Sequence, residues 1–117
     1  MLLAYFYDGQ YDRALAVTRS RLNPDIWDYV YRPLIYAALG RKTEAASAVS
    51  ELVKQDADYS AESWLSNVGA FARDVELDRF LDSNRKAGLP VCATEAQLAK
   101  YPDMTRLEQC QQQRAKS

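Results

Sequence analysis

One segment of the chain occurs twice, and this internal repeat limits the possible folds more than any other feature of the sequence. Residues 3–14 read LAYFYDGQYDRA and residues 34–45 read LIYAALGRKTEA, so equivalent positions are 31 residues apart. Repeats of about 20 to 50 residues are typical of stacked supersecondary units, each of which buries its apolar face against a neighbour. The identical positions are Leu3 and Leu34, Tyr5 and Tyr36, Gly9 and Gly40, and Ala14 and Ala45.

Each copy of the repeat has the pattern of two helices joined at a glycine. Gly9 and Gly40 stand between apolar helical segments, and glycine adopts the positive φ that such a turn requires without a steric penalty. Small residues such as Ala14 and Ala45 allow antiparallel helices to approach closely. The second helix of each copy carries an apolar stripe that we expect to be buried. The stripe consists of Ala14, Val17 and Leu22 in the first copy, and of Ala45, Ala48, Val49, Leu52 and Val53 in the second.

Further helices are predicted after the repeat. Pro24 is placed to begin the helix that opens the second copy, and a third helical unit is predicted between Tyr59 and Pro90. Ser60 can cap its first helix and Asp74 its second, because both side chains accept hydrogen bonds from free N–H groups. The apolar residues are Trp64, Leu65, Val68 and Phe71 in the first helix and Leu77, Phe80 and Leu81 in the second. The unit ends in Lys86-Ala87-Gly88-Leu89-Pro90, a sequence typical of a helix stop.

The spacing of tyrosine, glycine and alanine resembles the centre of a tetratricopeptide (TPR) repeat. The matching residues are Tyr5, Gly9, Tyr11 and Ala14 in the first copy and Tyr36, Gly40 and Ala45 in the second. The offset of 31 residues differs from the TPR period of about 34, and Leu2 and Pro33 stand where the TPR pattern has a glycine. The resemblance implies an all-α superhelix of about three αα-hairpins over residues 1–90. A short C-terminal helical hairpin over residues 91–117 would pack on it.

A longer stretch resembles the C-terminal region of bacterial class III adenylate and guanylate cyclases. The matching elements are Gly40-Arg41-Lys42-Thr43-Glu44-Ala45, Asp58-Tyr59-Ser60, Trp64-Leu65, and Arg85-Lys86-Ala87-Gly88-Leu89-Pro90. A cyclase catalytic domain is not among them, so any cyclase activity would belong to another part of a longer parent chain. The resemblance implies a regulatory or interaction module of a bacterial signalling protein.

The TPR resemblance also implies a binding surface. In TPR proteins the first helix of each pair lines a concave groove that holds a partner segment, here by apolar anchors. The residues expected at this groove are Leu3, Phe6, Tyr7, Trp27, Val30, Leu34 and Ala38. Apolar and aromatic residues at helical spacing are equally typical of a core. Both interpretations of these seven residues, groove and core, stay open from the sequence.

The two cysteines lie in the C-terminal segment, on either side of a predicted turn at Tyr101-Pro102-Asp103. Capping boxes are predicted to start one helix at Thr94 and another at Thr105. In an antiparallel hairpin Cys92 and Cys110 come roughly opposite each other, which suits a disulfide. Two reduced, packed thiols and a redox switch are the alternatives. Residues 111–117 are polar and expected to fray.

Composition excludes several classes of function. The chain has no histidine, and 15 basic side chains against 16 acidic ones give a net charge of −1. Without histidine there is no Ser-His-Asp or Cys-His arrangement, and two cysteines alone do not complete a tetrahedral zinc site. Asp56 and Asp58 form a carboxylate pair in a turn, but no second motif accompanies them. We expect no catalysis, no cofactor, no metal and no nucleic-acid partner, since phosphate binding requires a basic surface.

These observations predict a non-catalytic module that binds a protein or peptide segment or the rest of a larger parent chain. The alternative is a free-standing homodimeric adaptor that binds an apolar peptide segment. A dimer is expected because the first repeat is cut off at Met1 and would leave an apolar face that a second copy could cover. The apolar start of the chain is too short for a membrane span and lacks the basic front of a signal peptide. A cytoplasmic location with no membrane insertion is therefore expected.

Overall fold

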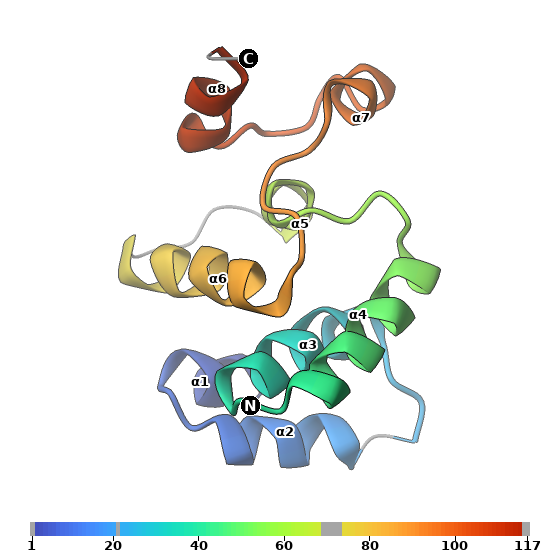
Figure 1. The fold of residues 1–117 in the computed structure, drawn as a ribbon, viewed down its shortest axis with the longest axis vertical. Coiled ribbons are helices and arrows are strands. Elements are labelled where there is room, and N and C mark those ends of the chain that lie inside the picture. The colour runs from blue at the N-terminus through green and yellow to red at the C-terminus, as the bar shows by residue number, and fades with distance from the viewer. Residues whose placement is uncertain (1, 21, 69–73, 116–117) are drawn as a thin grey trace.

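The computed structural model describes residues 2–20, 22–68 and 74–115, and within these ranges the chain forms eight helices and no strand (Figure 1). The predicted all-α class is therefore confirmed. The helices are α1 (Leu2–Tyr7), α2 (Tyr11–Arg19), α3 (Ile26–Ala38), α4 (Lys42–Gln55), α5 (Ala61–Val68), α6 (Asp74–Ala87), α7 (Glu95–Lys100) and α8 (Glu108–Ala115).

Three helices end in the same type of glycine turn. After α1, the Gly9 N–H donates to the Phe6 carbonyl at 3.1 Å and the next N–H donates to the Tyr5 carbonyl at 2.8 Å. The same two hydrogen bonds follow α3 at Gly40 and α6 at Gly88. The three glycines have φ values of 77°, 74° and 82°, a region that residues with a Cβ avoid. These are Schellman turns, and they confirm the turns predicted at the glycines.

Helix α3 begins at Ile26 rather than at Pro24. The Asp25 side chain accepts a hydrogen bond from the Asp28 N–H at 3.2 Å, and the Asp28 side chain accepts one from the Asp25 N–H at 3.0 Å. This reciprocal capping box fixes the N-terminus of the helix. The proline thus stands just outside the helix, and its predicted place in the first turn is wrong.

Two residues of the predicted buried stripes are exposed. Leu22 is 96% exposed because α2 ends three residues before it, at Arg19. Val53 is 46% exposed on α4, where Leu52 is the residue that turns into the core. The prediction that Leu22 and Val53 are buried is therefore wrong. The rest of each stripe is buried or half-buried.

Helix α3 carries the centre of the core. Its residues Val30, Tyr31, Leu34 and Ile35 are all 0% exposed. Helices α2, α4 and α6 pack against it (Figure 1). The Tyr31 ring lies 5.2 Å from the ring of Phe6 on α1 and 5.8 Å from that of Phe80 on α6. Tyr31 thus connects the first, third and sixth helices through aromatic contacts.

The third predicted unit consists of α5 and α6, and α6 is the helix of this pair that lies along α3. Helix α5 contacts α3 through the Trp64 ring, which lies 4.8 Å from that of Trp27. Ser60 caps α5 as predicted, because its hydroxyl accepts the Ser63 N–H at 3.0 Å. Leu65, Phe80 and Leu81 are buried and Leu77 is half-buried. Phe71 and the side chains of Val68 and Asp74 lie outside the described residues.

The C-terminal segment follows the prediction at α7 and departs from it at α8. The capping box of Thr94 and Gln97 is present. Helix α8 starts at Glu108 instead of after Thr105. The N–H groups of Thr105 and Leu107 donate to side chains of α5. Helix α8 continues to Ala115; fraying of residues 111–117 stays a prediction, and residues 116–117 lie outside the described residues. Helices α7 and α8 lie apart in Figure 1, joined by an extended segment, and do not pack along each other.

Candidate functional site

The predicted groove residues divide into two groups. Phe6, Val30 and Leu34 are 0% exposed, so the prediction that these three residues line an open groove is wrong. Leu3, Tyr7, Trp27 and Ala38 are half-buried. The reason is that α6 covers the face shared by α1 and α3. Phe80 of α6 packs on Tyr31, and the Arg79 guanidinium donates to the Tyr7 carbonyl at 3.0 Å.

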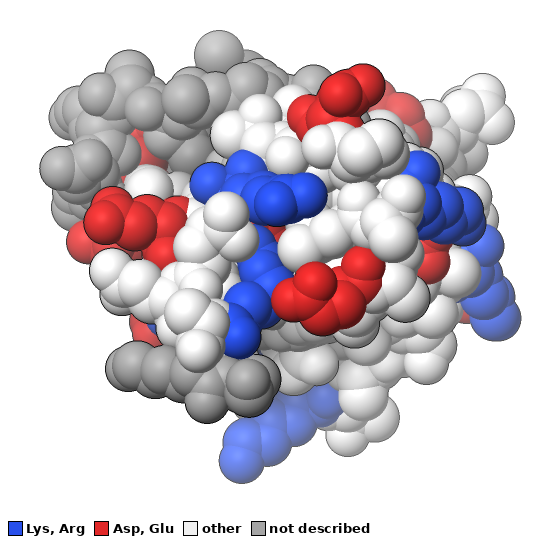
Figure 2. Space-filling view, turned by 90° about the horizontal axis from the view of Figure 1, so that it is seen from above, with Lys and Arg blue, Asp and Glu red and all other residues white. Residues whose placement is uncertain are grey.

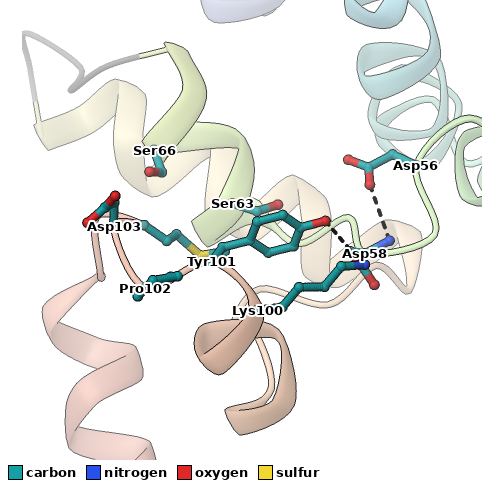
Figure 3. Close-up of a pocket in the computed structure, with 9 residues that line it drawn as sticks. Asp56, Asp58, Ser63, Ser66, Lys100, Tyr101, Pro102 and Asp103 are labelled. Atoms are coloured by element: carbon teal, nitrogen blue, oxygen red, sulfur yellow. Dashed lines mark hydrogen bonds and ion pairs between the residues drawn. The ribbon is translucent and has the colours of Figure 1, made fainter.

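A different hollow lies where the α4–α5 loop, α5 and the α7–α8 segment meet (Figure 3). It has a volume of about 500 Å³. We call it the junction pocket. Its lining residues are Asp56, Asp58, Ser63, Ser66, Lys100, Tyr101, Pro102, Asp103 and Met104. Three carboxylates and one ammonium group thus line it, and Tyr101, Pro102 and Met104 supply apolar surface.

Asp58 is the most strongly bonded carboxylate of the junction pocket. It accepts hydrogen bonds from Lys100 Nζ at 2.9 Å and from the Tyr101 hydroxyl at 3.1 Å, as Figure 3 shows. The hydrogen bond from Lys100 is the larger and that from Tyr101 the smaller cause that holds the pKa of the Asp58 carboxyl below its ordinary value. The hydrogen bond to Asp58 also raises the pKa of the Lys100 ammonium group. Asp58 and Lys100 therefore carry opposite charges at neutral pH.

The side chains of Asp56, Ser63 and Ser66 in the pocket form hydrogen bonds with backbone groups. The Asp56 carboxylate accepts the Asp58 N–H at 3.2 Å. The Ser63 hydroxyl donates to the Ser60 carbonyl, and the Ser66 hydroxyl accepts the Thr105 N–H at 2.8 Å. Both hydroxyls are thus engaged in holding the backbone. The chemistry that the pocket offers is the binding of a cationic group beside an apolar surface.

A buried ion pair joins α5 to α8. Glu62 of α5 is 0% exposed. Arg114 of α8 donates to its two carboxylate oxygens at 2.8 and 2.9 Å. The N–H groups of Ala93 and Leu107 donate to the same carboxylate at 2.9 and 2.8 Å. Burial alone would raise the pKa of Glu62, but the bonds from Arg114 and the two backbone groups outweigh it, so the pKa lies below its ordinary value.

The structure contains a disulfide between Cys92 and Cys110, whose Cα atoms are 5.5 Å apart. Cys92 precedes α7 and Cys110 lies in the first turn of α8, so the bridge does not join two packed helices as the hairpin prediction assumed. Of the three alternatives that the sequence left open, the bonded form is the one present. Cys110 is 0% exposed and Cys92 is half-buried.

Several residues of this region had only weak signals in the sequence. Asp56 and Asp58 stood out as a carboxylate pair, but nothing connected them to Lys100, which lies 42 residues after Asp58. Glu62 is an acidic residue between the buried Ala61 and the apolar Trp64 and Leu65, a position that could have indicated a buried charge. Arg114 gave no signal, because it stands in a polar C-terminal segment.

No family model, no curated protein and no solved structure matches the chain.

The described part of the chain contains no group of three or more His, Cys, Asp or Glu side chains placed to hold a metal ion. None of its helices is both long and apolar enough to cross a membrane. Figure 2 views the molecule from the end that carries α7 and α8. Acidic and basic side chains alternate there, with uncharged residues between them.

Proposed function

We propose that this chain is a non-catalytic helical module that binds a protein segment at the junction pocket. The observation that carries the proposal is the pocket itself, which is lined by the carboxylates of Asp56, Asp58 and Asp103, a single ammonium group and an exposed aromatic ring. A lysine or arginine side chain of the partner would enter among the carboxylates. An adjacent apolar side chain would lie on Tyr101, which is 42% exposed.

Asp103 is the residue best placed to recognise the partner. It is exposed and has no hydrogen bond or ion pair within the described residues, whereas Asp58 already holds Lys100. A cationic side chain would therefore gain an uncompensated carboxylate at Asp103 without breaking an existing pair. Interactions between exposed charges are screened by salt, so binding should weaken as ionic strength rises.

The test is a titration with N-acetyl-arginine methylamide, followed by the amide resonances of the chain in NMR spectra. Resonances of residues at the junction pocket should shift in a saturable way, and N-acetyl-glutamine methylamide should cause no such shift. Asp103→Asn should weaken binding by about threefold at low salt, in line with the loss of one exposed charge interaction. Asp12→Asn on α2 is the matched control, since Asp12 is also exposed. Equal shifts with the neutral probe, or no effect of Asp103→Asn, would refute the proposal.

We propose in addition that the module is the C-terminal regulatory part of a bacterial signalling protein of the cyclase type, with the TPR-like arrangement in its first two helix pairs. The supports are the repeat of glycine turns at an offset of 31 residues and the similarity of residues 40–90 to cyclase tails. An immunoblot of cells of the source organism tests this idea. A single band at 13.3 kDa, the mass of this chain, would contradict it, and a band several times larger is expected.

A homodimeric adaptor is the second candidate. A hollow of about 590 Å³ next to α1 favours it, and is lined by Leu3, Ala4, Tyr5, Tyr7, Asp8, Gln10 and Glu76. A second copy could cover Leu3, Tyr5 and Tyr7, which supply apolar surface in this hollow. Sedimentation velocity should then show a dimer that Leu3→Lys dissociates. A monomer at high concentration would exclude this candidate.

A further inference from the structure

One wall of the junction pocket belongs to a loop that is closed at its base. The disulfide joins Cys92 to Cys110, 18 residues apart. Lys100, Tyr101, Pro102, Asp103 and Met104 all lie between these two cysteines. The opposite wall comes from the α4–α5 loop and α5. The shape of the pocket therefore depends on how the loop of residues 92–110 is held against the rest of the chain.

Glu62 binds the backbone near both ends of the same loop. One of its carboxylate oxygens accepts the N–H of Ala93, which follows Cys92, and the other accepts the N–H of Leu107, three residues before Cys110. The side chain of Arg114 completes the arrangement from α8. The disulfide and the Glu62 carboxylate thus act as two clamps on the neck of one loop, and one of the two is covalent.

The outer part of the loop is held by fewer and more exposed bonds. The Thr105 N–H donates to Ser66, and Lys100 and Tyr101 donate to Asp58. Exposed ion pairs contribute little to stability. The position of this wall of the pocket therefore depends mainly on the disulfide and on the Glu62 carboxylate, the two clamps near the ends of the loop.

We propose that the oxidation state of the two cysteines controls the junction pocket, so that the oxidised chain presents the formed pocket and the reduced chain does not. This regulation rests on the proposed function only for its biological meaning. The reductant is a protein or small-molecule dithiol. Cys110 is fully buried and Cys92 is half-buried. The thiolate of the reductant therefore attacks the sulfur of Cys92, which is the more accessible of the two.

The exchange is balanced in atoms and electrons. Attack breaks the bond between the two cysteine sulfurs, and Cys110 leaves as a thiolate that takes up a proton. The second thiol of the reductant then attacks the mixed disulfide and releases Cys92 as a thiol. Two electrons and two protons pass to the chain, and the reductant leaves as its own disulfide. The buried core around Tyr31 contains neither cysteine, so it stays folded while the loop loses its covalent clamp.

Hydrogen exchange tests the clamp without any ligand. Amides of Ala93, Thr105 and Leu107 should exchange about 100-fold faster after reduction by dithiothreitol, because a covalent closure of this length strongly restricts loop opening. Amides within α4 should be unchanged. Unchanged loop amides would overturn the proposal, and so would faster exchange throughout the chain, which would show that the disulfide is needed for the fold as a whole. A Cys92→Ser, Cys110→Ser chain should behave like the reduced protein, and exchange like that of the oxidised protein would overturn the proposal.

Titration with N-acetyl-arginine methylamide tests the consequence for the pocket. Binding to the oxidised chain and at least tenfold weaker binding to the reduced chain are expected. Equal binding to both forms would overturn the redox control while leaving the proposed function intact. If the oxidised chain does not bind the probe, the proposed function fails, and the hydrogen-exchange result alone decides whether reduction frees the loop.

Discussion

Replacing Glu62 by glutamine should destabilise the chain strongly, because the carboxylate accepts four hydrogen bonds in a fully buried position. The glutamine side chain keeps one oxygen, which can still accept two of the four hydrogen bonds. Its NH₂ group replaces the second oxygen and cannot accept from the two donors that faced that oxygen. A buried donor without a partner costs about 1–3 kcal/mol, so two of them cost about 2–6 kcal/mol. Breaking a buried ion pair by removing one partner costs about 3–5 kcal/mol.

The side chain of Arg114 is 13% exposed, which allows some solvation of the charge that is left behind. We therefore expect Glu62→Gln to lower the free energy of unfolding by about 3 kcal/mol, at the lower end of the range for broken buried pairs. With a shift of roughly 4 °C per kcal/mol for a chain of this size, Tm should fall by about 12 °C. Urea unfolding followed by circular dichroism and a thermal scan measure the two quantities.

The control is Glu51→Gln, which removes an exposed carboxylate paired with Lys54 at 3.4 Å, where the Glu51 side chain is 52% exposed. This change should cost less than about 0.5 kcal/mol. In a double-mutant cycle with Arg114→Met, the double variant should be more stable than the sum of the single losses predicts, since it leaves no unpaired charge. The reasoning is refuted if Glu62→Gln and Glu51→Gln cost the same.

Three more predictions concern pH, the core and the glycine turns. The pKa of Glu62 is below its ordinary 4.5, so the contribution of the Glu62 carboxylate to stability is present above pH 4.5 and is lost as the pH falls through the lowered pKa. When the free energy of unfolding is measured against pH, it should decrease below pH 4.5, and this decrease should be smaller in Glu62→Gln. Phe80→Ala should lower the free energy of unfolding by about 3–5 kcal/mol in urea titrations, because Phe80 is fully buried against Tyr31. Gly40→Ala should cost about 1–2 kcal/mol for its positive φ alone, since a Cβ at this position meets no atom within 4 Å. Gly9→Ala should cost about the same in thermal scans, because its φ is similar and a Cβ there would be in ordinary van der Waals contact with Arg79 Nη1 at 3.4 Å.

Local features of the fold were predictable where a short segment determines its own structure. The turns at Gly9, Gly40 and Gly88 need a positive φ, which glycine adopts easily. The caps at Ser60 and Thr94 involve residues only three positions apart. Such features require no knowledge of the rest of the chain.

Features that depend on distant partners were not predictable in the same way. Thr105 has the local pattern of a capping box, but its N–H group bonds to Ser66, 39 residues away, and α8 starts at Glu108. Periodicity identified an apolar face on α1 and α3 but did not show that α6 covers it. For the candidate site, the sequence indicated Asp56 and Asp58 and left the disulfide open among three alternatives. Glu62 and Arg114 are 52 residues apart, and no rule based on neighbouring residues predicts that they pair.

The position of α6 on α1 and α3 has a consequence for the synthesis of the chain. Arg79 and Tyr7, which it brings together, are 72 residues apart. While the ribosome produces the first four helices, the aromatic face around Tyr31 has nothing to cover it, and with elongation at roughly 5–20 residues per second this state lasts for several seconds. The nascent chain is therefore a natural client for a chaperone that binds apolar segments, and an early stop in translation would release a product prone to aggregation.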